Sequence, residues 1–466
     1  MIKLDPKLTP TDFGPALERF WSRSAECIDA VERSCPPGSA SPVFTVQGRY
    51  TAKGWTEWTQ GFQYGSALLH FDATGDERYL ELGRDRTVSV MAPHLTHVGV
   101  HDHGFNNVST YGNLLRLIRE GRLPDHVWER RYFELALKLS GAVQAARWAK
   151  TSDGSGYIYS FNGPQSLFVD TIRSCRALAI SHQLGHVLME ERDEKISLLQ
   201  RLVEHANNTA RYNIWYGEGQ GTYDVAGRTA HESVFNTNNG DYRCPATHQG
   251  YSPFTTWTRG LAWAMLGYAE LLEWLGTRSG GELSAFGGLE AIRTNWLKAA
   301  RATCDFYINE TPVCGVPYWD TGAPGLAKLG DYRSRPADPF NEYEPVDSSA
   351  AAIAAQGLLR LGHYLVHQQG ETAAGVRYVE AGLATVRTLL QEPYLSTSPD
   401  HEGLLLHSVY HRPNGWDYVP IGRKVPCGES SMWGDYHIRE VALYIERLAE
   451  NAPYYTFFGP TSSEQQ

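Results

Sequence analysis

Apolar residues recur at intervals of three and four along about twelve segments of this chain, which is the spacing of one face of an α-helix. The segments cover residues 13–34, 60–73, 79–93, 107–120, 126–149, 168–188, 192–214, 257–276, 287–308, 347–369, 372–391 and 432–449. Strand-like alternation is confined to short pieces such as 156–159 and 404–410. The pattern therefore predicts an all-α protein.

Taken in pairs, the predicted helices alternate between two kinds. One helix of each pair is rich in Ala, Gly and Leu and poor in charge, as in 262–269, and such a helix is buried on most sides. Its partner is amphipathic, as in 192–206, and faces solvent. Each buried helix begins with a run of small, polar or aromatic residues. These six helix starts are residues 58–62, 101–107, 166–171, 256–260, 346–350 and 428–435.

Six buried helices alternating with six exposed ones describe a closed ring of helical hairpins, an (α/α)6 toroid. An open α-solenoid uses the same hairpins, but it would show a regular short repeat, which this chain lacks. We predict a single domain over 1–466, with residues 1–50 partly an N-terminal helix and loop and 451–466 a tail. In such a ring the N-termini of the inner helices converge on one face, where their free N–H groups favour anionic ligands.

Composition narrows the functional classes. The net charge is −10 without a basic block, which argues against nucleic acid as a partner. The aromatic share of 12% suits a sugar-binding cleft as well as a core. Seven scattered cysteines without a C-x-x-C pair indicate neither a disulfide framework nor a zinc knuckle. No segment has the length or composition of a membrane span or signal peptide. We expect a cytoplasmic monomer or homodimer with no membrane partner.

Two carboxylates on the converging helix starts suggest glycosidic bond cleavage, which commonly uses one protonated and one ionised carboxyl group. Asp170 lies in the apolar run Leu167-Phe-Val-Asp-Thr-Ile, so burial is expected to raise its pKa and suit it to proton donation. Asp102, among imidazoles and amides, is expected to be better solvated and ionised. Either residue alone could be only a helix N-cap. The same face is predicted to collect Trp58, His231, Gln249, Arg259, Trp263, Ser430 and Ser431.

His101 and His103 flank Asp102 and raise the possibility of a metal site, because imidazole and carboxylate are common metal ligands. The other candidate ligands, His231 and His248, are isolated in the sequence. Buried histidines are more often satisfied by hydrogen bonds than by a metal. We therefore predict no metal and no cofactor.

Eight motifs, in the same order from about residue 50 to 450, resemble those of the unsaturated glucuronyl hydrolases. They are Ala73-Thr-Gly-Asp-Glu-Arg-Tyr, His101-Asp-His-Gly-Phe, Phe168-Val-Asp-Thr, Thr247-His-Gln-Gly-Tyr-Ser, Thr256-Trp-Thr-Arg-Gly-Leu-Ala-Trp, Asp347-Ser-Ser-Ala-Ala-Ala-Ile-Ala, Tyr410-His-Arg-Pro-Asn-Gly and Glu429-Ser-Ser-Met-Trp-Gly-Asp-Tyr. Each motif alone is weak, and their order makes the resemblance specific.

The resemblance implies an (α/α)6 barrel that removes a 4,5-unsaturated uronic acid from oligosaccharides left by polysaccharide lyases, without a metal or organic cofactor. It implies that Asp170 protonates C4 and then activates water for attack at C5, while Asp102 supports the ring and tunes Asp170. By the same resemblance the other predicted residues bind substrate: His231, Gln249 and Arg259 the uronate, Trp58 and Trp263 by stacking, and Ser430 and Ser431 the neighbouring sugar. The alternatives are an unsaturated rhamnogalacturonyl hydrolase and a non-catalytic oligosaccharide-binding barrel.

The chain departs from the family pattern at a few positions. His103 replaces an aliphatic residue, and Asn106-Asn107 is more polar than usual. No Trp stands just ahead of Asp170, where the chain offers Tyr159 and Phe161. These departures are expected to alter substrate preference rather than the fold.

Overall fold

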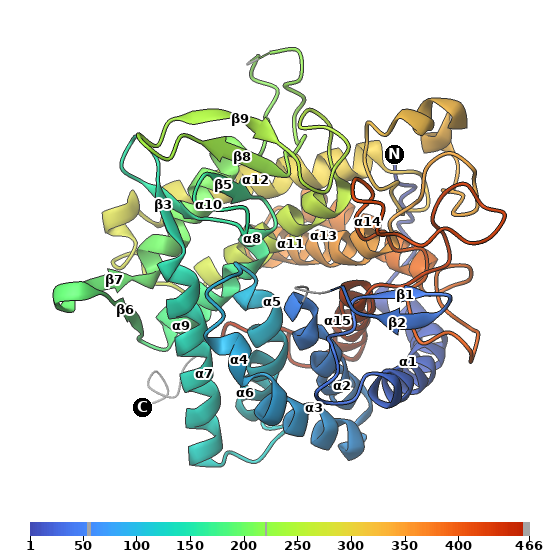
Figure 1. Ribbon diagram of the computed structural model, residues 1–466, viewed down its shortest axis with the longest axis horizontal. Helices are drawn as coiled ribbons and strands as arrows, with labels where there is room; N and C mark the ends of the chain where they lie inside the picture. The colour runs from blue at the N-terminus through green and yellow to red at the C-terminus, as the bar shows by residue number, and fades with distance from the viewer. Residues whose placement is uncertain (54–56, 220, 460–466) are drawn as a thin grey trace.

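The computed structural model describes residues 1–53, 57–219 and 221–459 (Figure 1). Within these residues an inner layer of helices is surrounded by an outer one. The inner layer consists of α2 (Gln60–Thr74), α5 (His103–Asn107) with α6 (Asn113–Arg119), α8 (Thr171–Ser174) with α9 (Arg176–Gln183), α11 (Thr258–Leu275), α13 (Ser348–Gln368) and α15 (Met432–Glu450). The outer layer consists of α1 (Gly14–Ser34), α3 (Glu77–Val90), α7 (Val127–Ala146), α10 (Leu198–Tyr212), α12 (Leu289–Glu310) and α14 (Thr372–Leu389).

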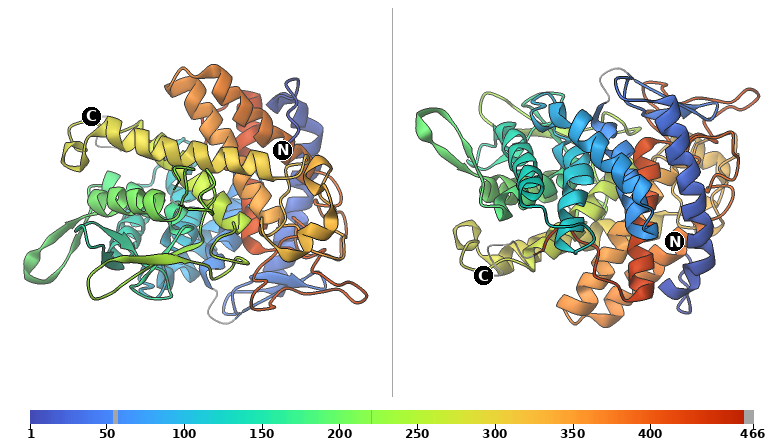
Figure 2. Two further views of the ribbon diagram at one scale, coloured as in Figure 1. Left: turned by 90° about the horizontal axis from the view of Figure 1, so that it is seen from above. Right: turned by 90° about the horizontal axis from the view of Figure 1, so that it is seen from below.

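The inner helices close into a ring. Each one contacts the next along the chain, and α15 returns to pack against α2. The outer helices pack against them, and α1 (dark blue) lies at one side of the molecule in both views of Figure 2. The predicted (α/α)6 toroid is confirmed, and the helix order matches the predicted alternation.

Burial follows the sequence pattern that predicted the two layers. Every residue of α11 is buried, whereas α10 buries mainly one face. Close packing between inner helices depends on small residues, as at Gly104 in α5. A Cβ atom there would lie 2.0 Å from the backbone oxygen of Ser174 at the end of α8. That contact holds together the two helices whose starts carry the predicted carboxylates.

Two predicted helices differ from the structure in an informative way. The segment 107–120 is interrupted by the π-helical turn η3 (Val108–Gly112), between α5 and α6. The segment 168–188 is preceded by β5 (Ser166–Phe168), which pairs antiparallel with β8 (Glu232–Phe235). β8 in turn pairs with β9 (Tyr242–Ala246). This sheet ends directly ahead of Asp170, where the backbone N–H of Val169 donates to the oxygen of His231 at 2.9 Å.

Three two-stranded hairpins account for the remaining strands of the described residues. They are β1–β2 (Phe44–Val46, Arg49–Thr51), β3–β4 (Trp148–Lys150, Gly156–Ile158) and β6–β7 (Val187–Met189, Lys195–Ser197). β4 confirms the strand predicted near residue 156. β7 occupies the expected beginning of the helix at 192, so α10 starts only at Leu198. The predicted strand at 404–410 forms isolated bridges and no ladder.

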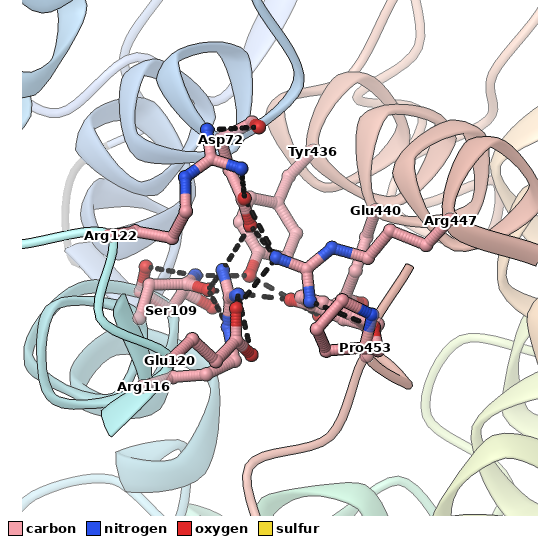
Figure 3. Close-up of polar contacts among 11 residues, drawn as sticks. Asp72, Ser109, Arg116, Glu120, Arg122, Tyr436, Glu440, Arg447 and Pro453 are labelled. Atoms are coloured by element: carbon pink, nitrogen blue, oxygen red, sulfur yellow. Dashed lines mark hydrogen bonds and ion pairs between the residues drawn. The ribbon is translucent and has the colours of Figure 1, made fainter. Parts of the chain in front are cut away.

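A buried charge network joins inner helices where α2, α6 and α15 end (Figure 3). The carboxylate of Asp72 accepts hydrogen bonds of 2.7 Å from Arg116 and from Arg447. Glu120 accepts from the same two guanidinium groups. Although burial opposes ionisation, the two arginines lower the pKa of Asp72. A buried pair of this kind is costly to break, because removing one partner leaves an uncompensated charge.

The segment after α15 packs beside this network. Tyr455, Phe457 and Phe458 are buried, and Tyr455 donates to Glu440 at 3.1 Å. These three side chains thus form part of the core, and from residue 460 on the tail expected over 451–466 lies outside the described residues. Within the described ranges, no helix is long and apolar enough to cross a membrane.

Candidate active site

A pocket of about 610 Å³ lies at the N-terminal ends of the inner helices. Four of the six predicted helix starts contribute to its lining, and the other two, at 346–350 and 428–435, do not. Its lining consists of Trp58, Val100, His101, Asp102, Phe105, Phe161, Asp170, His248, Gln249, Trp257, Arg259, Trp263, Tyr410, His411 and Trp416.

The structure brings both predicted carboxylates into this pocket. Asp102 precedes α5 and Asp170 precedes α8. Asp102 is only 7% exposed and Asp170 only 8%. Neither side chain accepts a capping hydrogen bond from its own helix. Asp347, ahead of α13, does cap its helix through the N–H groups of Ser349 and Ala350. The capping interpretation of Asp102 and Asp170 is therefore wrong, and both carboxylates remain available for chemistry.

The imidazole of His101 lies between the two carboxylates. Its Nε2 atom is 3.6 Å from Oδ1 of Asp170 and 3.8 Å from Oδ1 of Asp102. These distances permit ion pairing but exceed an ordinary hydrogen bond. The three side chains therefore form an electrostatic cluster in which the charge of each depends on the other two.

The electrostatics reverse the expected environments of the two carboxylates. Burial raises the pKa of Asp102, which is not better solvated than its partner. Burial also favours neutral Asp170, but the nearby imidazole of His101 outweighs it and lowers the pKa of Asp170. The apolar neighbours of Asp170 in the sequence had suggested the opposite. Its decisive neighbour, His101, comes from a different helix start.

Arg259 reaches the pocket with its guanidinium group already engaged. Nη1 donates to Asp347 Oδ2 at 2.8 Å and to the oxygen of Val409. Nη2 donates to Gln249 Oε1 at 2.9 Å and to the oxygen of Tyr410 at 2.7 Å. Because the amide oxygen of Gln249 is held by Arg259, its NH₂ group is the end left to meet a ligand. Arg259 thus orients Gln249 in the pocket.

His231 lies behind the pocket wall. Its Nδ1 atom accepts the backbone N–H groups of His248 and Gln249 at 3.0 and 3.1 Å. Burial lowers its pKa to about 3, so the ring is neutral at physiological pH. The predicted uronate ligand His231 therefore positions the backbone that carries Gln249.

The two predicted tryptophans both line the pocket. Trp58 stacks on Trp433, with ring centroids 5.2 Å apart and 24° between the planes. Trp263 is only 2% exposed, and its ring packs against Phe105 at 4.7 Å. Trp58 therefore offers the larger free surface for a sugar ring.

The structure does not bring Ser430 and Ser431 into the pocket, contrary to expectation. The Ser431 hydroxyl caps α15 by accepting the N–H of Gly434 at 3.1 Å. The Ser430 hydroxyl donates to the oxygen of Leu405 at 2.7 Å. Both side chains are fully buried. Capping explains why Ser431 stands just ahead of α15, because serine is a favoured N-cap residue.

Other pocket residues were not predicted as site residues: His101, His248, Tyr410, His411, Trp257 and Trp416. Phe161 lines the pocket near Asp170, whereas Tyr159 packs in a separate cluster. Most of the missed side chains lie within the quoted motifs, as do His248 and the pair Tyr410-His411. Membership of a motif is therefore the sequence signal that marks these aromatic and imidazole side chains as site residues.

The polar residues after Asp102 do not shape the pocket as expected. His103 is hydrogen-bonded through Nδ1 to Ser140 at 3.1 Å and through Nε2 to the oxygen of His97 at 3.0 Å. Asn106 and Asn107 likewise join neighbouring segments. Among the described residues, no group of three or more His, Cys, Asp and Glu side chains could hold a metal ion.

Fold and pocket together describe a helical toroid with two buried carboxylates facing a cleft. Comparison with known proteins agrees with this class, although no family model matches the chain. The unsaturated glucuronyl hydrolase of Bacillus sp. (strain GL1) is 26% identical over 411 residues, covering 86% of this chain and 89% of that protein. The unsaturated chondroitin disaccharide hydrolase of Streptococcus pneumoniae is 23% identical, covering 94% of this chain and 93% of that protein.

The solved structures point the same way. The crystal structure of the unsaturated glucuronyl hydrolase from Bacillus sp. GL1 superposes with a TM-score of 0.67 at 23% identity, covering 92% of this chain and 97% of that one. The chain is therefore similar to unsaturated glucuronyl hydrolases in sequence and in fold, as its motifs predicted.

Proposed function

We propose that this chain is a glycoside hydrolase that removes a non-reducing terminal 4,5-unsaturated glucuronic acid from lyase-generated oligosaccharides. The observation that carries the proposal is the pair of buried carboxylates, Asp102 and Asp170, joined by His101 in one pocket. The aromatic walls suit a sugar ring, and the amide of Gln249 suits its carboxylate.

The proposed reaction hydrates a vinyl ether instead of attacking the anomeric carbon. Asp170 protonates C4, and the resulting carboxylate accepts a proton from the water that attacks C5. The hemiketal then opens and releases the neighbouring sugar. Protonation at carbon needs an acid held at the correct position with a raised pKa. A bound anionic substrate would raise the pKa of Asp170, since a like charge and the loss of water both raise the pKa of a carboxyl group.

Two alternatives are weaker. A non-catalytic barrel would have no need for two buried carboxylates that do not cap their helices. An unsaturated rhamnogalacturonyl hydrolase would use the same fold, but the relatives described above carry the glucuronyl and chondroitin names. The chondroitin name makes glycosaminoglycan fragments the first substrates to test.

The test supplies unsaturated disaccharides from chondroitin, hyaluronan, heparin, gellan and ulvan digests and follows loss of the enoate ultraviolet absorbance. We expect at least one to be consumed, with the same rate in a chelator. Asp170→Asn should lose nearly all activity, while Asp400→Asn, at an exposed position, should retain it. Failure of every substrate would refute the proposed function. Loss of activity in chelator alone would refute the metal-free mechanism.

We further infer a cytoplasmic location and a monomer or homodimer. All seven cysteines are free, which fits a reducing compartment.

A further inference from the structure

His101 is held in the pocket without an ordinary hydrogen bond to either ring nitrogen in the part of the chain that the structure describes. The residue is 1% exposed, and its ring stacks on Phe161 with 25° between the planes. The rings of His101 and Phe168 meet in a T-shaped contact, with their centroids 5.7 Å apart. The two carboxylates are therefore the groups that decide whether this imidazole carries a proton.

The other titratable groups around the cluster do not compete for that role. Arg147 opposes a charge on His101, but it donates to the backbone oxygens of Val98, Tyr159 and Ser160. His205 and His231 are buried, and burial lowers the pKa of each to about 3. His97 lowers the pKa of Asp102, and burial lowers the pKa of His248.

The remaining interactions favour a proton on His101. Burial alone would lower the pKa of His101, but Asp102 and Asp170 outweigh it and raise that pKa. These interactions favour a protonated His101 beside an ionised Asp170. This arrangement leaves the proposed acid without the proton it must deliver.

We propose that His101 stores the proton that Asp170 delivers to the substrate. The inference rests on the proposed function. When the sugar ring expels water from the pocket, a neutral imidazole–carboxylic acid pair becomes favoured over the ion pair. The proton moves from Nε2 of His101 to Oδ1 of Asp170, and the electron pair of that N–H bond stays on nitrogen. Asp170 gives the proton to C4, recovers one from the attacking water, and returns it to His101 as product leaves.

The assignment makes His101 a positioning residue that acts through Asp170, and NMR tests it without turnover. Histidine-labelled protein is titrated, and the His101 signal is assigned by its loss in His101→Phe. We expect wild-type His101 to titrate above the usual value of about 6.5, and to titrate lower in Asp170→Asn. Titration at or below the usual value, or no response to Asp170→Asn, would overturn the proposal.

The pH profile of kcat gives the second test. His101→Phe preserves the ring against Phe161 and Phe168 but forces the proton onto a carboxyl group. We expect the basic limb to move down by about one pH unit or more, because a carboxyl group holds a proton less tightly than an imidazole between two carboxylates. The control His103→Gln removes the neighbouring imidazole, which does not face the carboxylates, and should keep the wild-type limb. An unchanged limb in His101→Phe, however low its kcat, would overturn the proposal.

Failure of the proposed function looks different. In that case the wild type consumes none of the unsaturated substrates, while the NMR titration still decides whether the cluster shares a proton.

Discussion

Arg259 donates a 2.9 Å hydrogen bond from Nη2 to Oε1 of Gln249, ten residues earlier in the chain. Its other terminal nitrogen pairs with Asp347 at 2.8 Å. The guanidinium group of Arg259 thus orients the side-chain amide of Gln249. Both residues were expected to bind the uronate directly. This relationship means that the two side chains act in series.

A double-mutant cycle should reveal that dependence. Gln249→Ala removes a hydrogen bond to a charged ligand group and should raise KM by about tenfold or more. Arg259→Lys releases the amide orientation and should also raise KM. Because Arg259 acts through Gln249, the double variant should cost less than the sum of the two. Additive effects on log KM would contradict the arrangement.

Ser431→Ala tests the reassignment of a predicted substrate ligand. Loss of the N-cap of α15 should lower the free energy of unfolding by about 1 kcal/mol, because the N–H of Gly434 loses its partner. KM should stay at the wild-type value, since the hydroxyl lies outside the pocket. Denaturant unfolding and initial rates measure the two effects, and an increase in KM at unchanged stability would restore the original assignment.

Asp72→Asn should show how strongly the charge network of Figure 3 stabilises the ring. The variant leaves Arg116 and Arg447 with less compensating charge in a buried place. We expect a loss of about 3–5 kcal/mol in the free energy of unfolding, measured in urea. Asp76→Asn, at the more exposed N-cap of α3, is the comparison and should cost about 1 kcal/mol or less. Equal losses would show that burial of the network adds no stability.

Glu446 should make stability depend on pH. Burial raises its pKa to about 7, while its Oε2 accepts from Trp21 Nε1 at 3.0 Å. The unfolded chain loses this proton near pH 4.5 and the folded chain near pH 7, so the stabilisation is complete below pH 4.5 and is lost as pH rises to 7. Glu446→Gln keeps an acceptor for Trp21 and removes the titration.

The comparison is therefore made at two pH values. Relative to wild type, Glu446→Gln should be more stable at pH 8 by about 1–2 kcal/mol, after allowance for the partial exposure of the carboxyl group. The advantage should vanish below pH 4.5. An equal difference at both pH values would show that the pKa of Glu446 is not raised.

The two helical layers of the ring were predictable because the hydrophobic pattern of each helix lies within its own segment of the sequence. The uniform burial of α11 and the single buried face of α10 follow from composition and spacing within each helix. β5 was missed because three residues carry little local signal, and its partner β8 lies far along the chain. Strand pairing of this kind depends on contacts that one segment does not encode.

The site shows the same division. Sequence reasoning brought Asp102 and Asp170 to one face, since their distance from a helix start is a local property. It reversed their electrostatics, because the charge on Asp170 depends on His101 from another helix start. It also placed Ser430 and Ser431 in the pocket. A serine hydroxyl just ahead of a helix can contact a ligand or cap the helix, and the Ser431 hydroxyl caps α15. Proximity to a site was predictable, and the direction of a side chain was not.

The central claim is that Asp170 protonates C4 of an unsaturated uronate and so starts hydration of its double bond. Proton NMR of the wild-type reaction in D₂O tests this most directly. The account predicts one solvent deuterium at C4, in a single configuration, appearing as fast as the neighbouring sugar is released, and none with Asp170→Asn. Sugar release before the vinyl signal declines, or full deuteration by Asp170→Asn, would contradict it.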